Sequence, residues 1–222
     1  AHRSAHSAAS YHLDAGGRRV RARLALAAGL ALGLSKADSV YIASCAELLH
    51  NASLVHDDIQ DRDAIRRGQT AVWSKFGSNL AICTGDLLLS AAYRVLCRFS
   101  QPLLLPAMLG LLHQRTAVAI DGQCADLASS DGQSKGLAAY MSIATAKSGA
   151  LLSLPLELAL LAADHANAAT MARRSCENLA VSYQILDDLQ DLPADGVSAE
   201  GCVDQTQSLN IVFVLLNPND RN

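Results

Sequence analysis

The sequence predicts an all-α protein, and three observations lead to that prediction. Hydrophobic residues make up 50% of the 222 residues and aromatic residues only 4%, so leucine and alanine must fill most of the core. Both are strong helix formers, and runs of β-branched residues, which favour strands, are scarce. Apolar residues also recur at helical spacing between short polar, glycine-rich or proline-rich segments. We expect a single helical domain over residues 1–222.

The first expected helix runs from Val20 to Leu34, after a polar leader that breaks at Gly16-Gly17. Asp38 or Ser39 is expected to cap the next helix, whose apolar face continues to position 55. A charged loop should follow from Arg62 to Gln69.

The later helices follow from the same periodicity. Lys147-Ser148-Gly149 interrupts an apolar stretch, so we expect two helices there rather than one. The expected helices are 78–99, 103–127, two within 137–163, and one that begins at Asn167 or Thr170 and ends near Pro193.

Two acidic clusters share one pattern and lie about 130 residues apart in otherwise apolar segments. They are Asp57-Asp58-Ile59-Gln60-Asp61 and Asp187-Asp188-Leu189-Gln190-Asp191. In a helix the first and last aspartates of each cluster project from one face, where like charges repel each other. Divalent cations remove that cost, and oxygen ligands favour Mg²⁺, Mn²⁺ or Ca²⁺. The alternative for either cluster alone is an N-cap or a solvated acidic turn.

Basic residues accompany the first cluster. Guanidinium groups lie beside flexible backbone in two segments, Gly16-Gly17-Arg18-Arg19-Val20-Arg21 and Arg66-Arg67-Gly68. Each guanidinium group can bind two oxygens of a phosphate at once. His50 lies about two helical turns before Asp57 on the same face. Simple pairing of Arg66 and Arg67 with the aspartates is the alternative reading.

Two further polar residues occur in the second half. Lys147 stands alone in an apolar stretch, where an ammonium group needs a partner. Gln184 lies three residues before Asp187 and can donate a hydrogen bond to a phosphate or a water.

The overall composition excludes several classes of protein. A net charge of −3 argues against a nucleic-acid-binding protein, which needs a basic face. The six cysteines form no C-x-x-C pair and are expected to be reduced, core-filling thiols, as in a cytoplasmic protein. The start of the chain lacks a secretory apolar segment, and the longest apolar run, 149–163, is too short to cross a bilayer. We therefore expect a cytoplasmic protein without a transmembrane segment.

Taken together, these motifs resemble the trans-isoprenyl diphosphate synthases, also called polyprenyl synthetases. The resemblance runs from Gly16 to Asp191 and includes the family's Gly-Gly-Lys-Arg-x-Arg, Asp-Asp-x-x-Asp, Gly-Gln-x-x-Asp-Leu and Phe-Gln-x-x-Asp-Asp-x-x-Asp patterns. They correspond here to 16–21, 57–61, 122–127 and 183–191, with Arg18 and Tyr183 in place of the family's lysine and phenylalanine.

The resemblance implies an antiparallel helical bundle of the isoprenoid synthase type around a central apolar tunnel. It implies an enzyme that condenses isopentenyl diphosphate with an allylic diphosphate, assisted by Mg²⁺ at about three ions per active site, with Mn²⁺ able to substitute. It also implies a homodimer. The metal-binding residues would be Asp57, Asp58, Asp61, Asp187, Asp188 and Asp191.

The same resemblance assigns the basic groups to two substrates. Arg66 and Lys147 would bind the allylic diphosphate, with Gln184 in support. Arg18, Arg21, His50 and Arg67 would bind isopentenyl diphosphate.

Product length is expected to depend on the helix before Asp57, where Leu49, Ala52 and Ser53 would line the tunnel. Neither Ala52 nor Ser53 can block growth as a phenylalanine would, which predicts a product of 20 carbons or longer. A helical turn rises ~5.4 Å, close to one extended isoprene unit.

Two further departures from the family are visible. Gln207-Ser208-Leu209-Asn210 replaces a lysine-bearing loop, and the chain ends at Asn222, without the further helices usual in the family. Two alternative functions are a class I terpene cyclase and a non-catalytic subunit that regulates a partner synthase. Cyclases usually carry a different second metal motif, and non-catalytic subunits tend to lose aspartates. The aspartates at both clusters therefore favour the synthase.

Overall fold

A computed structural model describes residues 4–128 and 136–190, with side chains described as far as Leu186 in the last helix. The all-α prediction is confirmed, because the described residues are mainly helical and their β structure is one two-stranded hairpin. The chain divides into two compact units. The first comprises Ala1–Gln114 and Leu154–Thr170, and the second Arg115–Ser153 and Met171–Asn222. The single-domain organisation stays a prediction.

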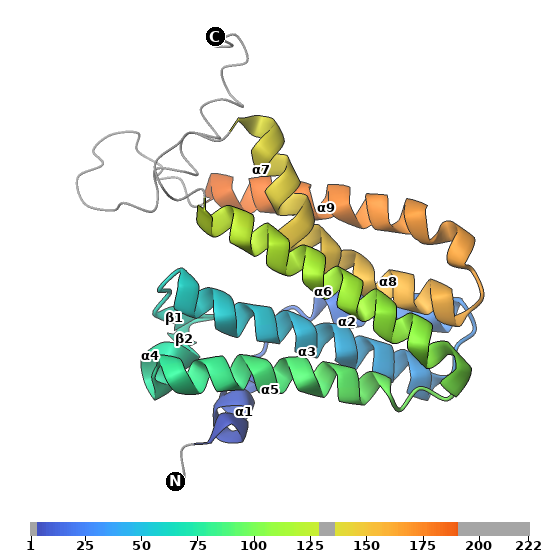
Figure 1. Cartoon of the computed structure of the whole chain (residues 1–222), viewed down its shortest axis with the longest axis horizontal. Coiled ribbons are helices and arrows are strands. Elements are labelled where there is room, and N and C mark those ends of the chain that lie inside the picture. The colour runs from blue at the N-terminus through green and yellow to red at the C-terminus, as the bar shows by residue number, and fades with distance from the viewer. Residues whose placement is uncertain (1–3, 129–135, 191–222) are drawn as a thin grey trace. The chain divides into compact units, whose positions relative to one another are not determined.

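Figure 1 shows the described helices and strands in their chain order. The first part of the chain contains α1 (Ala5–Asp14), α2 (Val20–Ala31), α3 (Lys36–Gln60), β1 (Ile65–Arg66), β2 (Gln69–Thr70), α4 (Val72–Phe76) and α5 (Ser78–Leu96). The rest contains η1 (Pro102–Leu104), α6 (Leu105–Ala128), α7 (Leu137–Ala144), η2 (Thr145–Gly149), α8 (Ala150–Ala162), η3 (Ala166–Ala168) and α9 (Ala169–Gln190).

Helix α3 is the central element of the first unit and packs against α2 and α5. In Figure 1, α3 and α5 lie side by side, with the hairpin and α4 at the C-terminal end of α3. Helix α3 begins after Ser35, whose hydroxyl accepts a hydrogen bond from the backbone N–H of Asp38. The predicted cap at Asp38 or Ser39 is therefore wrong. Asp38 instead accepts hydrogen bonds from the backbone and side chain of Ser100, which tie the start of α3 to the end of α5.

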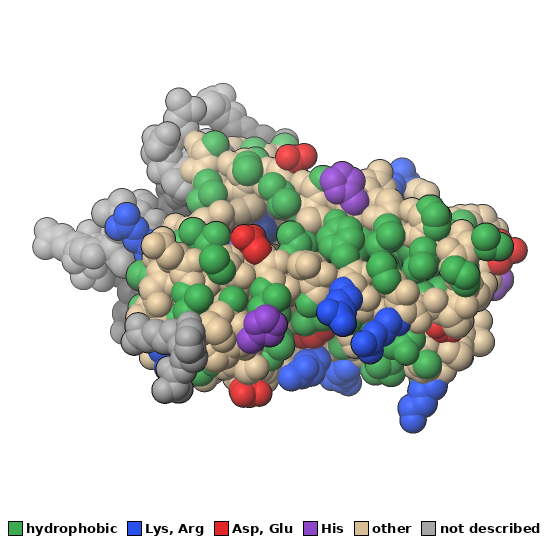
Figure 2. Space-filling model, turned by 60° about the horizontal axis from the view of Figure 1, so that its bottom comes forward, with side chains coloured by type: hydrophobic (Ala, Val, Ile, Leu, Met, Phe, Trp, Pro, Cys, Tyr) green, Lys and Arg blue, Asp and Glu red, His purple; other side chains and the backbone are tan. Residues whose placement is uncertain are grey.

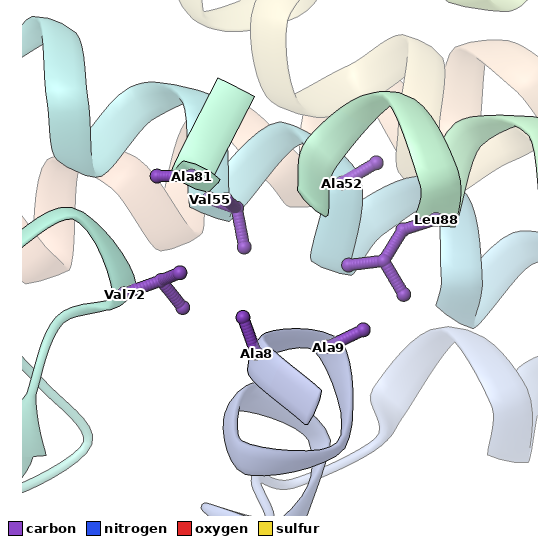
Figure 3. Close-up of a cluster of buried hydrophobic side chains, with 7 residues drawn as sticks. All are labelled: Ala8, Ala9, Ala52, Val55, Val72, Ala81 and Leu88. Atoms are coloured by element: carbon purple, nitrogen blue, oxygen red, sulfur yellow. The ribbon is translucent and has the colours of Figure 1, made fainter. Parts of the chain in front are cut away.

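Helix α1 was not predicted, because it begins in a polar leader and Tyr11 and Leu13 are its only large apolar residues. Ser4 and Ser7 form a reciprocal capping box that starts the helix. Its apolar contribution is small but well placed, since two of its alanines pack against α3, α4 and α5 (Figure 3). The buried cluster comprises Ala8 and Ala9 of α1, Ala52 and Val55 of α3, Val72 of α4, and Ala81 and Leu88 of α5. The small side chains allow the helices to approach closely.

The segment predicted as the charged loop 62–69 contains a β-hairpin. Ile65 pairs with Thr70 and Arg66 with Gln69 in an antiparallel register. The two linking residues, Arg67 and Gly68, both have positive φ, at 52° and 77°. Positive φ at both positions of a two-residue hairpin loop is typical of a type I′ turn.

The predicted break near Lys147 is also absent. Residues Leu137–Ala162 form one continuous helical run in which Thr145–Gly149 is a π-helical turn. Such turns add a residue to a helix without ending it and are frequent at functional sites. The glycine that suggested a break is instead the place where the helix contacts α9, because Gly149 leaves room for Glu177.

The cysteine prediction was wrong in part. Cys45 and Cys176 are buried, whereas Cys83, Cys97 and Cys124 are exposed, and these five are free thiols. Cys202 lies outside the described residues.

Two of the described helical runs, Pro102–Ala128 and Leu137–Ala162, have the length and composition of a membrane-crossing helix. Polar residues interrupt both runs in the sequence, so neither is an unbroken apolar stretch. In the second run 67% of the most apolar window is buried inside the protein, as in an ordinary core helix, but in the first only 22% is buried. Figure 2 shows one face of the molecule, on which hydrophobic side chains lie among charged ones.

Candidate functional site

The first aspartate cluster lies at the C-terminal end of α3. Asp57 is half-buried, and Asp61 is exposed and caps the helix through a 2.8 Å bond from its N–H to the carbonyl of Asp57. Asp57 lies in the last turn of α3 and Asp61 follows the helix by one residue, so the predicted common face of their carboxylates is compatible with the backbone.

Asp58 has a different environment, because it is fully buried and paired with the hairpin. Its Oδ1 accepts a hydrogen bond from Nε of Arg66 at 2.6 Å and forms an ion pair with Nη2 of the same arginine at 2.5 Å, while Oδ2 has no hydrogen-bond partner. Burial raises the pKa of the Asp58 carboxyl, against the lowering effect of Arg66. Arg66 also bonds Asp63 at 3.1 Å. Asp58 thus holds the first arginine of the hairpin in place.

Arg67 occupies the turn of the hairpin in a left-handed conformation that is unusual for a residue with a side chain. Its Nη1 donates to the carbonyl of Gly16 and, at 3.3 Å, to Oδ1 of Asn51. Its guanidinium also lies against Gly17, where a Cβ would come within 2.8 Å of Cζ. The Gly-Gly step of the sequence therefore makes room for this arginine.

Behind Arg67 lies a buried polar network. Asn51 on α3 donates from Nδ2 to the carbonyl of Glu47 at 2.7 Å, and its Oδ1 lies 3.1 Å from Nε2 of His12 on α1. Asn51 and His12 are 1% and 2% exposed. Glu47 is also buried and accepts a hydrogen bond from the backbone N–H of Ala22.

The hydrogen bond from Ala22 to the Glu47 carboxylate explains why arginines are tolerated at the start of α2. Arg19 occupies the N-cap position with φ 48° and provides no side-chain cap. Cations disfavour a helix N-terminus, but the buried carboxylate of Glu47 supplies the opposite charge there. Arg21 is half-buried on the first turn of α2, and Arg18 is exposed in the preceding loop.

The electrostatics identify a cluster of cations and histidines. The pKa of His50 is lowered well below its usual 6.5, first by burial and then by Arg21, Arg67, His12 and Arg66. The pKa of His12 is lowered to about 4 by burial and Arg67. Burial also lowers the pKa of Arg67, and its arginine neighbours add to the lowering, against the raising effect of Glu47. An anion would relieve the mutual repulsion of these groups.

The carboxylates of this unit fit a hard divalent cation. Among the residues that the structure describes, no group of three or more His, Cys, Asp or Glu side chains could hold a metal ion. Mg²⁺ does not need such a cage, because it is usually bound by one or two carboxylates, waters and substrate phosphates. Asp57 and Asp61 meet that requirement.

The second unit holds Lys147 at the π-helical turn. Its Nζ lies 3.3 Å from Oδ2 of Asp126 on α6, so the lysine has an ionic partner. A Cβ at Gly122, one turn before Asp126, would lie 2.6 Å from the backbone nitrogen of Lys147. In the Gly-Gln-x-x-Asp pattern, Gly122 thus allows the backbone of Lys147 to come close to α6, and Asp126 is the ionic partner of the lysine.

The second aspartate cluster lies at the end of α9, where Asp187 and Asp188 occupy the last turn. Gln184, one turn earlier, is half-buried. Asp191 and the Gln207–Asn210 segment lie outside the described residues. The Asp187, Asp188 and Asp191 metal assignment remains a prediction.

The residues expected to set product length differ in their surroundings. Leu49 and Ala52 are 4% and 3% exposed, and Ala52 belongs to the buried cluster of Figure 3. Ser53 is half-buried, and its hydroxyl bonds the carbonyl of His50.

Several residues of the site were not identified from the sequence. His12, Glu47 and Asn51 join the basic cluster through tertiary contacts between distant parts of the chain. Only their polarity on otherwise apolar helix faces marks them in the sequence. Asp126 lies within one of the family motifs, but the sequence alone does not pair it with Lys147.

The sequence and the fold are similar to those of known proteins. The polyprenyl synthetase family pattern matches residues 2–208. The geranylgeranyl diphosphate synthase of Sulfolobus acidocaldarius is 33% identical over 192 residues, which cover 84% of this chain and 58% of that protein. The (2E,6E)-farnesyl diphosphate synthase of Mycobacterium tuberculosis is 33% identical over 174 residues, covering 78% of this chain and 48% of that protein. The chain thus spans about half to three fifths of these relatives.

The fold is also similar to that of a solved structure. The geranylgeranyl pyrophosphate synthetase from Pyrococcus horikoshii superposes with a TM-score of 0.80 at 33% identity, over 86% of this chain and 59% of that one. Since the family pattern covers most of the sequence and the fold agrees, this chain belongs to the polyprenyl synthetase family and has the all-α fold of the isoprenoid synthases.

Proposed function

We propose that this chain is a Mg²⁺-dependent trans-prenyltransferase that condenses isopentenyl diphosphate with an allylic diphosphate. One observation supports the proposal best. In a single compact unit, two carboxylates one helical turn apart accompany a basic cluster built from α2, α3 and the hairpin. Such a combination suits a substrate that carries both a metal-bound and an arginine-bound phosphate.

The proposed reaction begins with cleavage of the allylic C–O bond, which leaves an allylic cation and a diphosphate. The double bond of isopentenyl diphosphate attacks the cation to form the new carbon–carbon bond. Loss of one proton, which we assign to the departing diphosphate, then restores a double bond. Mg²⁺ held by Asp57, Asp61 and the second cluster would offset the charge of the leaving group.

The protein groups act mainly by binding and orientation. Arg66, held by Asp58, and Lys147, held by Asp126, are proposed to bind the allylic diphosphate with Gln184. Arg18, Arg21, His50 and Arg67 are proposed to bind isopentenyl diphosphate. Fixed cations stabilise a developing anion without reorganising during the reaction. The remaining contribution to the rate comes from holding the two substrates close together and aligned.

A product of 20 carbons or longer agrees with the small residues Ala52 and Ser53 on α3. A geranylgeranyl diphosphate synthase and a farnesyl diphosphate synthase are both among the relatives, so the length needs its own experiment. The proposal includes a homodimer, a cytoplasmic location and about three Mg²⁺ ions per site.

The experiment is a product assay with the full chain. Labelled isopentenyl diphosphate is incubated with dimethylallyl, geranyl or farnesyl diphosphate, with Mg²⁺ or with a chelator, and the products are separated by chromatography. A linear product that depends on both substrates and on Mg²⁺ supports the synthase. Cyclised hydrocarbons formed without isopentenyl diphosphate would identify a cyclase, and absence of any product would identify a non-catalytic chain.

A pair of variants tests the assignment of groups to the two substrates. Arg21→Ala should raise the Michaelis constant for isopentenyl diphosphate more than that for the allylic substrate. Lys147→Ala should show the opposite preference. Equal effects of both variants on both substrates would reject the assignment.

A further inference from the structure

We propose that His12 and Asn51 are positioning residues that orient the Arg67 guanidinium for isopentenyl diphosphate. The inference rests on the proposed function, because Arg67 is assigned to that substrate. Neither residue belongs to the arginine or aspartate motifs, and His12 comes from a helix that the sequence did not reveal.

The orientation of the Asn51 amide is fixed by its neighbours. Its Nδ2 is engaged with the backbone carbonyl of Glu47 at 2.7 Å, and the Glu47 carboxylate lies 3.5 Å away. Both of these partners are acceptors, so the nitrogen must face them and Oδ1 must face the other way. Oδ1 therefore accepts hydrogen bonds from His12 and from Arg67.

The same orientation assigns the proton on His12. Because Oδ1 of Asn51 can only accept, the Nε2 atom of His12 must carry the hydrogen. A neutral ring with the proton on Nε2 meets this need, and the burial that lowers the pKa of His12 favours that neutral form. An unprotonated Nε2 would leave two lone pairs facing each other at a buried site.

Arg67 needs such support for two reasons. Its backbone is left-handed, which costs about 1 kcal/mol for a residue with a side chain. Its guanidinium also lies near Arg66 and Arg19, which would repel it toward solvent. The hydrogen bond from Arg67 to Asn51 and the one to Gly16 hold the guanidinium against α3 and the segment before α2.

Helix α1 supplies His12 from a fixed position. Its alanines pack in the cluster with α3, α4 and α5, and Tyr11 donates to the carbonyl of Thr70 at 2.8 Å. Gln69 donates back to the carbonyl of Tyr11 at 3.2 Å. Helix α1 therefore braces the hairpin through Tyr11 and, separately, reaches the arginine through His12 and Asn51.

The test compares His12→Phe and Asn51→Ser with His12→Gln. His12→Phe keeps the volume and removes the donor, and Asn51→Ser withdraws the acceptor without adding volume. His12→Gln retains a donor amide. We expect the first two to raise the Michaelis constant for isopentenyl diphosphate by about five- to tenfold. The constant for the allylic substrate and the turnover number should change by less than about twofold, and His12→Gln should restore much of the loss.

Tyr11→Phe is the matched control. It removes a hydrogen bond between α1 and the same hairpin but leaves the contacts of Arg67 intact. It should lower the melting temperature slightly and leave both Michaelis constants unchanged. Should His12→Phe fail to fold, Asn51→Ser alone carries the comparison.

The outcomes separate this inference from the proposed function. If the wild-type chain forms no prenyl product, the proposed function fails and this inference fails with it. If the wild type is active but His12→Phe and Asn51→Ser alter both Michaelis constants equally, or neither, then the residues have a structural role only. The inference would also be overturned if Tyr11→Phe raised the Michaelis constant for isopentenyl diphosphate selectively, as His12→Phe and Asn51→Ser are expected to do.

Discussion

The guanidinium of Arg67 lies against the backbone of Gly17, so closely that a Cβ at position 17 would be 2.8 Å from its Cζ atom. The two residues are far apart in the sequence and belong to two separate basic motifs. Their contact joins the Gly-Gly step before α2 to the hairpin after α3. The two motifs therefore form one structural unit rather than two independent groups of cations.

Gly17→Ala should consequently impair binding of isopentenyl diphosphate. The new methyl group would displace the Arg67 guanidinium, and φ of 124° at this position would strain any residue other than glycine. We expect the Michaelis constant for isopentenyl diphosphate to rise about tenfold or more, as for loss of a charged hydrogen bond. Steady-state kinetics with each substrate varied in turn would measure it.

Gly33→Ala provides the control for backbone strain. Gly33 also has a positive φ, at 80°, but a Cβ there would meet no atom within 4 Å. This variant should lower stability by a similar backbone cost and leave the Michaelis constants unchanged. Equal kinetic effects of the two variants would show that strain, rather than the contact with Arg67, is responsible.

Asp58 and Asp63 should differ in their importance for stability, although both bond Arg66. Asp58 is fully buried, and Asp58→Ala would leave the half-buried arginine with one exposed partner. We expect a loss of about 2 kcal/mol, or roughly 4–8 °C in melting temperature. Asp63→Ala removes an exposed pair and should cost under about 1 kcal/mol. Thermal unfolding followed by circular dichroism would test the contrast.

Stability should fall in mild acid because His12 and His50 are buried in their neutral forms. The folded-state pKa of His12, about 4, lies below the ordinary value of 6.5, so the unfolded chain binds a proton more readily. The stabilisation is complete above about pH 6.5 and is lost as pH falls toward 4, on the order of 3 kcal/mol for His12. His12→Gln should flatten this part of the profile, measured by urea unfolding. An unchanged slope would contradict the assignment.

The helices and the chemistry of the motifs were predictable from the sequence because they depend on local properties. The start of α2, the extents of α5 and α6 and the helical setting of Asp57 and Asp61 follow from periodicity and spacing. Capping was less predictable, since Ser35, Asp38 and Ser39 are all good cap residues. The choice among them depends on Ser100, which engages Asp38 from beyond the end of α5.

The remainder depends on tertiary contacts that leave little trace in the sequence. The turn of the hairpin has Arg67-Gly68 where a type I′ turn usually has Asn-Gly, so the sequence did not indicate a hairpin there. The arginine at this position is proposed to bind substrate. Asp58 belongs to the same motif as Asp57 and Asp61, but its side chain pairs with Arg66 of the hairpin. The polar network around Asn51 likewise becomes visible only in three dimensions.

Product length can be tested with Ser53→Phe. The residue lies one turn before Asp57 and is half-buried, so a phenyl ring there should shorten the growing chain and shift the main product toward farnesyl diphosphate. Ala52→Phe is also a candidate from the sequence, but its position in the buried cluster predicts overpacking, with a cost of about 1–3 kcal/mol. Chromatography of the products and thermal unfolding distinguish the two effects. An unchanged product from Ser53→Phe would reject its place beside the tunnel.

The turnover of Asp57→Ala with farnesyl diphosphate, labelled isopentenyl diphosphate and Mg²⁺ is the decisive measurement. Asp57 is half-buried on the carboxylate face at the end of α3, and its loss removes one of the two ligands proposed there. We predict that the wild type forms a 20-carbon or longer product, and that Asp57→Ala is slower by orders of magnitude, with about the same melting temperature. Asp187→Ala should behave in the same way. Near-normal turnover in the folded Asp57→Ala variant would contradict the proposal that these aspartates hold the metal ions of a prenyltransferase.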